Sequence, residues 1–106
     1  MTHDPHYASK AIGDIAPKLA QLTDEVLFGD IWARPSLSPR DRSIATVAAL
    51  IALNRAEQLP FHLRRARDNG VTDAELIELT THLAFYGGWP VAISALAVLR
   101  RLEDQH

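Results

Sequence analysis

His62 is the residue whose neighbours in the sequence are most suited to proton transfer. In a helix it shares a stripe with Gln58, four residues earlier, and with Ala66, four residues later, and apolar side chains border this stripe. An imidazole at the edge of a partly buried cleft can exchange a proton near neutral pH. A half-buried structural histidine bonded to Gln58 or to a backbone carbonyl gives the same pattern, so both interpretations stand.

A second imidazole, His82, falls on one side of a predicted helix together with Glu75 and Glu78. The simplest interpretation of this side is a solvated face with a Glu78–His82 pair one helical turn apart. Apolar residues nevertheless flank His82, and Tyr86 follows it by four positions. An imidazole and a phenol on one side of a helix are suited to a pocket wall, and the pattern leaves both interpretations open.

The other charged candidates have ordinary structural explanations. Glu57 is expected in the first turn of a helix, where a carboxylate interacts favourably with the helix dipole. Arg40 and Arg42 flank Asp41 and indicate an exposed ion pair near a helix start. Three further arginines are expected on an exposed face, from which one could hold a carboxylate. They are Arg64, Arg65 and Arg67.

The residue types also exclude several kinds of chemistry. The sequence contains no cysteine, which rules out disulfides, cysteine-ligated zinc and thiol-based peroxide reduction by this chain. The histidines and glutamates lack HExxH or a comparable spacing, so no metal site is predicted. Trp32, Phe85 and Trp89 are expected in the core rather than as stacking platforms for nucleic-acid bases.

Length and charge place the chain in a broad class. Its 106 residues correspond to one domain, and a formal net charge of −2 argues against nucleic acid as a partner. The start of the chain lacks the apolar run of a signal peptide, and no stretch is long enough for a membrane span. The sequence therefore predicts a cytoplasmic protein with no membrane partner, in which residues 1–10 form a flexible N-terminal segment.

The spacing of apolar residues predicts an all-α protein, a small bundle of about five to six helices. A first amphipathic helix is expected over residues 12–26, where apolar side chains recur every three or four positions. Residues 28–37 are predicted to form a loop that holds a short helical turn. A second helix is expected to begin at Ser38 and Pro39, which suit the N-cap and the first helical position, and to run to about Asn54.

Proline, glycine and capping residues mark the later helices. A third helix is predicted over residues 56–69, with Pro60 in its first turn. Residues 72–75 have the spacing of a capping box, which opens a fourth helix. Glycines at positions 87–88 end that helix, and a fifth is expected over residues 90–99 or beyond.

One segment of the second helix predicts how the chain assembles. Residues 44–53 are apolar on every side, with Thr46 as the only polar residue. A helix that is apolar all round is buried all round, and a chain this short has few other elements to cover it. Neighbouring subunits are the expected cover, so the sequence predicts a homo-oligomer.

Several stretches of the sequence resemble the carboxymuconolactone decarboxylase family. They are residues 27–32 (LFGDIW), 37–42 (LSPRDR), 46–53 (TVAALIAL), 57–62 (EQLPFH) and 81–86 (THLAFY), followed by Trp89 and Pro90. The resemblance covers about residues 27–99, and EQLPFH and THLAFY are its most specific parts. It implies one domain over residues 1–106 with the fold of the alkylhydroperoxidase-D group, assembled as a ring-shaped homohexamer, a trimer of dimers.

The same resemblance implies an activity. It is the cofactor-free decarboxylation of γ-carboxymuconolactone, an unsaturated lactone acid in the degradation of aromatic compounds. The redox branch of this superfamily carries a Cys-x-x-Cys-x-x-x-His motif. If its histidine is placed on His62, the two cysteine positions fall on Arg55 and Gln58. The chain is therefore not expected to be a thiol peroxidase.

The implied reaction gives the candidate residues expected roles. Decarboxylation of such a lactone needs an acid that returns a proton and donors near the carbonyl oxygen that becomes negative. His62 is expected to return the proton, and His82 or Tyr86 to stabilise the oxyanion. Glu57 is expected to orient an imidazole.

A carboxylate substrate also needs a cation to hold it. Arg42 or Arg55 is expected to supply that cation, with Gln58 as a further substrate-binding residue. No metal or other cofactor is expected. The alternative, from a different functional class, is a non-catalytic ligand-binding or assembly protein on the same scaffold.

Overall fold

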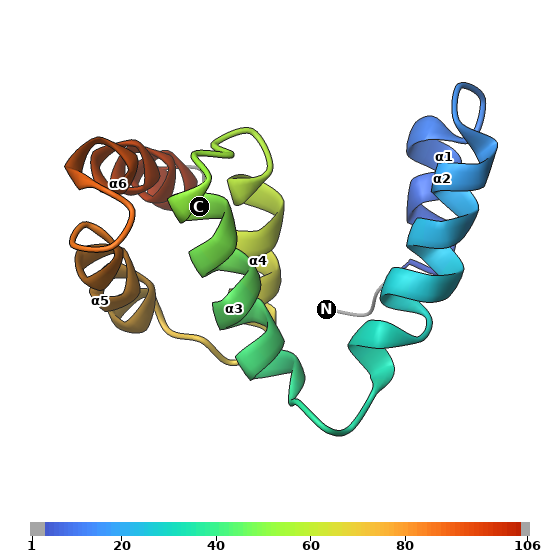
Figure 1. Ribbon diagram of the computed structural model, residues 1–106, viewed down its shortest axis with the longest axis horizontal. Coiled ribbons are helices and arrows are strands. Elements are labelled where there is room, and N and C mark those ends of the chain that lie inside the picture. The colour runs from blue at the N-terminus through green and yellow to red at the C-terminus, as the bar shows by residue number, and fades with distance from the viewer. Residues whose placement is uncertain (1–3, 105–106) are drawn as a thin grey trace. The chain divides into compact units, whose positions relative to one another are not determined.

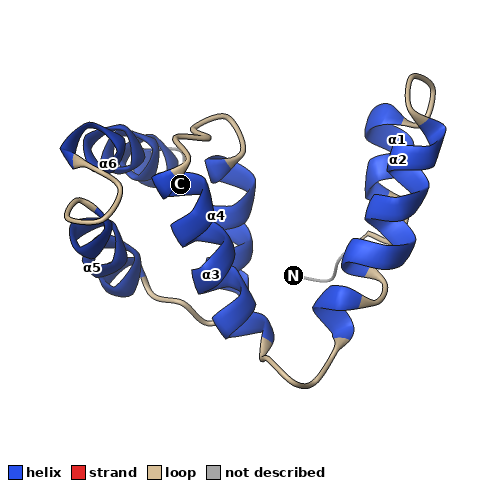
Figure 2. Cartoon of the chain, viewed as in Figure 1, coloured by secondary structure: helices blue, strands red, loops and turns tan. Residues whose placement is uncertain are grey.

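The structure, a computed structural model, describes residues 4–104 and is built from helices (Figures 1 and 2). Within that range there are six α-helices, a π-helical segment and a short 3₁₀ turn, and no strand is found. The predicted all-α class is therefore confirmed. The chain divides into two compact units, Met1–Pro39 and Arg40–His106.

The first unit consists of short helical elements. They are α1 (Tyr7–Ile12), α2 (Pro17–Gln21), the π-helical segment η1 (Leu22–Phe28) and the 3₁₀ turn η2 (Ile31–Ala33). The turn η2 is the short helical turn expected within residues 28–37. Of the segment expected to be flexible, residues 7–10 belong to α1 and residues 1–3 lie outside the described residues.

The single amphipathic helix predicted over residues 12–26 is wrong. The chain leaves helical geometry after α1, and Ala16 has φ −135° and ψ 71° immediately before Pro17. A proline ring disfavours helical geometry at the residue before it, which explains the break. The apolar stripe that suggested the helix faces solvent, since the side chains of Ile15 and Leu19 are 82% and 56% exposed.

A buried carboxylate joins η1 to the start of α1. Asp24 in η1 accepts hydrogen bonds from the backbone N–H of Ala8 to Oδ1 at 2.8 Å and of Ser9 to Oδ2 at 2.9 Å. These amides open α1, whose N-cap residue, His6, makes no side-chain capping bond. Asp24 therefore caps α1 from a distant position, because the first amides of a helix have no acceptor within the helix itself.

Replacing Asp24 by alanine should destabilise the first unit by about 1–2 kcal/mol, because it leaves two amides without their acceptor. Urea unfolding followed by circular dichroism measures this loss. Asp24→Asn is the matched control: it keeps one acceptor oxygen and should cost less. Equal unfolding midpoints for the wild type and Asp24→Ala would show that the cap contributes nothing.

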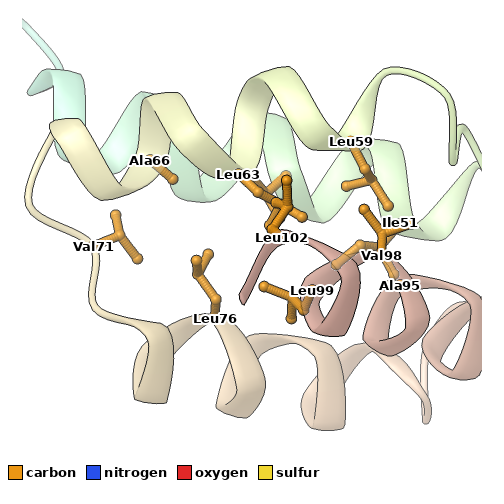
Figure 3. Close-up of a cluster of buried hydrophobic side chains, with 11 residues drawn as sticks. Ile51, Leu59, Leu63, Ala66, Val71, Leu76, Ala95, Val98, Leu99 and Leu102 are labelled. Atoms are coloured by element: carbon orange, nitrogen blue, oxygen red, sulfur yellow. The ribbon is translucent and has the colours of Figure 1, made fainter. Parts of the chain in front are cut away.

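The second unit is a bundle of four longer helices, α3 (Pro39–Ala52), α4 (Leu59–Asp68), α5 (Asp73–Leu83) and α6 (Trp89–Asp104). Helix α6 packs against both α4 and α5. Figure 3 shows the core where side chains of all four helices meet. Its largest fully buried aliphatic members are Val47, Ile51, Leu59, Leu63, Leu76 and Val98.

Local capping and proline signals predict most of these helix boundaries. Helix α3 begins at Pro39, and the capping box of Thr72 and Glu75 opens α5 as predicted. The start of α4 was placed too early, because it lies at Leu59 rather than near residue 56. Asn54, with φ 57°, turns the chain away from α3, and residues 54–58 form a loop before α4.

Two arginines from neighbouring helices hold the start of α5. The Arg67 Nε lies 2.7 Å from a carboxylate oxygen of Asp73, and the Arg40 guanidinium pairs with Glu75. The pair expected between Arg40 and Asp41 is replaced by this contact with another helix. Arg67 is mostly covered, with a side chain 19% exposed, rather than on the open face predicted for it. The N-terminal turn of α5 is therefore tied to both α3 and α4.

The turn between α5 and α6 packs closely on the end of α3. A Cβ at Gly87 would lie only 3.2 Å from the Cα of Ala52, so this position accepts no larger residue without a shift of backbone. Gly88 follows with φ 109°, which favours glycine. The close packing of this turn fixes the position of the backbone next to Tyr86.

Two aromatic residues expected in the core are in fact on the surface. Phe85 and Trp89 are 79% and 65% exposed and contact each other edge to face, whereas Trp32 is buried as predicted. Trp89 lies with Ile93 and Leu96 on the side of α6 that faces away from the core. Helix α6 is therefore apolar on two sides, and the helices of the second unit cover one of them.

Candidate functional site

His82 lines a pocket between α3 and α5. The pocket has a volume of about 350 Å³ and is lined by Ile44, Val71, Glu75, Glu78, Leu79 and His82. Aliphatic side chains form one part of its wall, and two carboxylates and the imidazole form the other. The predicted grouping of Glu75, Glu78 and His82 on one side of a helix is confirmed, and this side is both exposed to solvent, as the simplest interpretation expects, and part of the pocket lining.

The ring of His82 packs against the ring of Tyr86. Their centroids are 4.8 Å apart and the planes are inclined by 34°. Tyr86 lies in the turn after α5, yet the pairing expected from their spacing is present. The phenol is 77% exposed, so it extends the polar wall beyond the pocket toward solvent.

The two carboxylates of the pocket differ in their partners. Glu75 accepts a hydrogen bond from the Thr72 backbone N–H at 3.0 Å and pairs with Arg40. The backbone bond from Thr72, and then the bond from Arg40, lower the pKa of Glu75 below its usual value. Glu78, by contrast, makes no hydrogen bond or ion pair with any residue in the range 4–104. The Glu78–His82 pair that the spacing predicts is therefore not formed, although both side chains line the pocket.

His62 lies on α4 in a different environment. It is half-buried, its Nδ1 is shielded from solvent, and its ring meets the ring of Phe61 edge to face at 4.9 Å. Burial, and secondarily the positive charge of Arg65, lower the pKa of His62 to about 4. The ring is therefore neutral at pH 7. Among the described residues that line the pocket of His82, His62 does not occur.

Acidification should destabilise the fold through His62. Its pKa is about 4 in the folded chain and 6.5 when unperturbed, so between these values the unfolded chain binds the proton more readily. The stabilisation is complete above pH 6.5 and is lost as the pH falls through 4. Between pH 7 and pH 4.5, the melting temperature of wild type should fall further than that of His62→Gln. Equal falls in both proteins would contradict this account.

Three other expected site residues come together in the loop between α3 and α4. Arg55, Glu57 and Gln58 line a polar pocket of about 640 Å³ with Asn54 and Ala56. Glu57 was expected inside the helix and lies before it instead. Gln58 is the N-cap residue of α4, but its side chain makes no capping bond, and the first turn of α4 carries no acidic residue. This pocket therefore combines the guanidinium of Arg55 and the side-chain amide of Gln58 with the N-terminus of α4.

The remaining expected residue, Arg42, lies half-buried in α3 and lines neither of these two pockets. Sequence reasoning missed the contact of Arg40 with Glu75, because it joins residues far apart in the chain. Within residues 4–104 no group of three or more His, Asp or Glu side chains is placed to hold a metal ion. None of the helices described is long and apolar enough to cross a membrane.

The fold and the pocket together define a small all-α protein with acid and base side chains beside an apolar wall. The sequence model of the carboxymuconolactone decarboxylase family matches residues 17–101. This chain therefore belongs to the carboxymuconolactone decarboxylase family.

Relatives of the chain include decarboxylases. It is 44% identical over 69 residues to a 4-carboxymuconolactone decarboxylase of Acinetobacter baylyi, across 65% of this chain and 52% of the relative. It is 36% identical over 81 residues to a nitrosuccinic acid decarboxylase of Metarhizium robertsii, across 76% of this chain and 57% of the relative. The chain thus spans about half the length of these two curated relatives.

A third relative is similar over more of its length. It is an uncharacterized 15.0 kDa protein of Paracoccus denitrificans, 27% identical in an alignment of 105 residues that covers 94% of this chain and 78% of the relative.

Proposed function

We propose that this protein is a cofactor-free decarboxylase of γ-carboxymuconolactone or of an unsaturated lactone acid of that type. The observation that carries the proposal is the 44% identity to a 4-carboxymuconolactone decarboxylase. The second decarboxylase relative is also named for a small carboxylic acid. The pocket at His82, with its apolar wall and its imidazole, offers a group for the proton transfer of such a reaction.

The reaction makes three demands on a site. Loss of CO₂ breaks the bond between the ring carbon and the carboxylate and leaves an electron pair on the ring. Conjugation moves this pair onto the lactone carbonyl oxygen, and a proton must then return to carbon. The site therefore needs a proton donor, a hydrogen-bond donor near that oxygen, and a cation for the carboxylates.

We assign the role of proton donor to His82 rather than to His62. With a pKa of about 4, only about one His62 side chain in a thousand carries a proton at pH 7. Its neutral ring suits a hydrogen bond to the substrate but not the transfer of a stored proton. His82 lines the pocket and is itself exposed, so water can return its proton after each turnover.

Tyr86 and Arg55 fill the other two roles in this proposal. The phenol of Tyr86, stacked on His82, serves as the donor to the carbonyl oxygen. Helix α3 ends at Ala52, and Arg55 follows three residues later. Gly87, in the turn that carries Tyr86, packs against Ala52. Arg55, with Gln58 beside it in the loop pocket, is therefore the preferred carboxylate partner.

Turnover of γ-carboxymuconolactone by the purified chain tests the proposal. Ultraviolet absorbance follows loss of the lactone, and CO₂ release identifies the step, with heat-denatured protein as the control. Nitrosuccinic acid provides a second substrate for comparison. Binding of the lactone without consumption would instead indicate a ligand-binding protein on this scaffold. Neither binding nor turnover would reject the lactone as substrate.

We also infer that the protein works as a homo-oligomer, a ring-shaped hexamer built as a trimer of dimers. An exposed apolar row on α6 supports association, together with one exposed leucine that follows α3. On α6, Trp89, Ile93 and Leu96 are 65%, 53% and 37% exposed, and at the end of α3 Leu53 is 62% exposed. Surfaces of this kind usually mark sites of contact with another protein. The segment 44–53, expected to be buried all round, also shows exposed alanines in the single chain.

Sedimentation at micromolar concentration should therefore detect a species several times heavier than the 11.7 kDa chain. Replacing Ile93 by glutamate places a charge in the exposed apolar row of α6 and should shift the protein toward smaller species. Glu103→Gln, an exposed change on the same helix, is the control. A well-folded wild-type monomer under these conditions would exclude the assembly.

A further inference from the structure

We propose that two copies of this chain associate through α6, whose exposed row of side chains pairs in antiparallel fashion with the same row of the second copy. This α6 row consists of Trp89, Ile93, Leu96 and Arg100. The inference rests on the proposed homo-oligomer and deepens it, because it gives one interface of the assembly its residues and its register. It does not depend on the proposed decarboxylase activity.

The spacing of the α6 row is that of a helix that pairs with another helix. Its members follow one another at intervals of four, three and four residues. Residues at these intervals form a narrow stripe along one side of an α-helix, as in coiled coils. The opposite side of α6 contributes Val98, Leu99 and Leu102 to the core. The α6 row is therefore a second contact face, separate from the one that packs inside the bundle.

The order of residue types along the α6 row is complementary to itself when it is reversed. In an antiparallel pair whose two-fold axis passes between positions 94 and 95, Ile93 faces Leu96 of the partner copy. The same register places Trp89 opposite Arg100 of the partner copy. Each contact occurs twice around a two-fold axis. Two aliphatic pairs therefore fill the centre of the contact, and a Trp–Arg pair closes each end.

Arg100 decides between the antiparallel and the parallel arrangement. Its side chain is exposed and makes no hydrogen bond or ion pair with any residue in the range 4–104. A guanidinium group stacks favourably on the face of a tryptophan ring, and more strongly where water is excluded. A parallel pair would instead bring the two Arg100 side chains together, and like charges across an interface are costly. The antiparallel register avoids that repulsion.

The surface around the α6 row fits another helix better than a small ligand. Phe85 is 79% exposed and its ring meets that of Trp89 edge to face, with centroids 6.5 Å apart, so it extends the apolar surface at one end of the row. Ala97, exposed beside the row, is small enough to let a second helix approach closely. None of the row residues lines the pockets described above, whereas small-molecule sites are concave.

Cysteine cross-linking tests the register directly, because the chain contains no cysteine of its own. Ile93→Cys and Leu96→Cys, co-expressed so that mixed dimers form, should give a disulfide-linked heterodimer on mild oxidation, detected by mass spectrometry. Trp89→Cys alone should not cross-link to itself, because the antiparallel register separates the two positions by about 16 Å along the helix axis, beyond the reach of a disulfide. A parallel pair would give the reverse result.

Arg100→Ala, compared with Arg101→Ala, tests the Trp–Arg contact. Arg101 is also exposed on α6 but lies outside the row, so its replacement removes the same charge without the contact. Sedimentation over a dilution series should show a dissociation constant raised at least about tenfold in Arg100→Ala, because each pair loses two cation–π contacts. Arg101→Ala should dissociate like wild type.

These measurements do not use turnover, so a failure of the decarboxylase proposal leaves them intact. An oligomer in which Trp89→Cys links to itself overturns the register and keeps the proposed assembly. An oligomer in which Arg100→Ala and Arg101→Ala dissociate alike overturns the Trp–Arg contact and with it the pairing proposed here. A well-folded wild-type monomer at micromolar concentration overturns both this pairing and the assembly, and would leave the α6 row to a different protein.

Discussion

Replacing His82 by glutamine is expected to lower kcat for γ-carboxymuconolactone by about 10² to 10⁴, the usual contribution of one acid or base group. KM should change much less, because the proposal gives the carboxylates of the substrate to Arg55 rather than to His82. The side chain of His82 is exposed, so its loss removes no buried contact and the fold should be kept. Steady-state kinetics and circular dichroism measure the two effects.

His62→Gln is the matched comparison for this experiment. Because burial keeps the ring of His62 neutral at pH 7, its replacement should lower kcat less than the replacement of His82. A folded His62→Gln with the larger loss would return the proton-donor role to His62, as the sequence alone suggested. A folded His82→Gln with unchanged turnover would remove His82 from the reaction.

Replacing Leu63 by alanine should have the largest effect on stability. Leu63 is 1% exposed and lies among side chains of α4 and α6 in the core (Figure 3). Truncation of such a leucine costs about 2–5 kcal/mol, because the cavity that it leaves is only partly filled by relaxation. This is a large part of the roughly 5–15 kcal/mol that stabilises a typical small protein. Urea unfolding would measure it.

Leu53→Ala is the control for this core substitution. Leu53 follows α3 and is 62% exposed, so the same change should cost clearly less. Equal losses in the two variants would mean that another subunit covers Leu53 as completely as the core covers Leu63. That result would support the inferred assembly, because Leu53 is exposed in the single chain.

Structure that depends on neighbouring residues could be predicted from the sequence. Pro39 and the pair Thr72 and Glu75 marked the starts of α3 and α5, because a cap or a proline acts within one turn. The same local logic grouped His82 with Tyr86, since side chains four apart on a helix are neighbours.

Structure that depends on distant residues could not be predicted in this way. The cap of α1 by Asp24 and the pairing of Arg40 with Glu75 join positions that no local pattern relates. The exposure of Phe85 and Trp89 depends on which side of α6 the core occupies, and α6 is apolar on two sides. The neutral state of His62 likewise depends on burial, which spacing alone does not give.

The wall of the His82 pocket has a consequence for how relatives of this protein can diverge. Val71 belongs to the buried core, and Ile44 and Leu79 pack against it, yet all three line the pocket. Selection for a differently shaped ligand at these positions therefore also changes the stability of the bundle. Glu78 and His82, on the exposed side of the pocket, carry no such penalty. New specificities should thus evolve more easily through exchange of polar residues than through enlargement of the apolar wall, unless stabilising substitutions elsewhere come first.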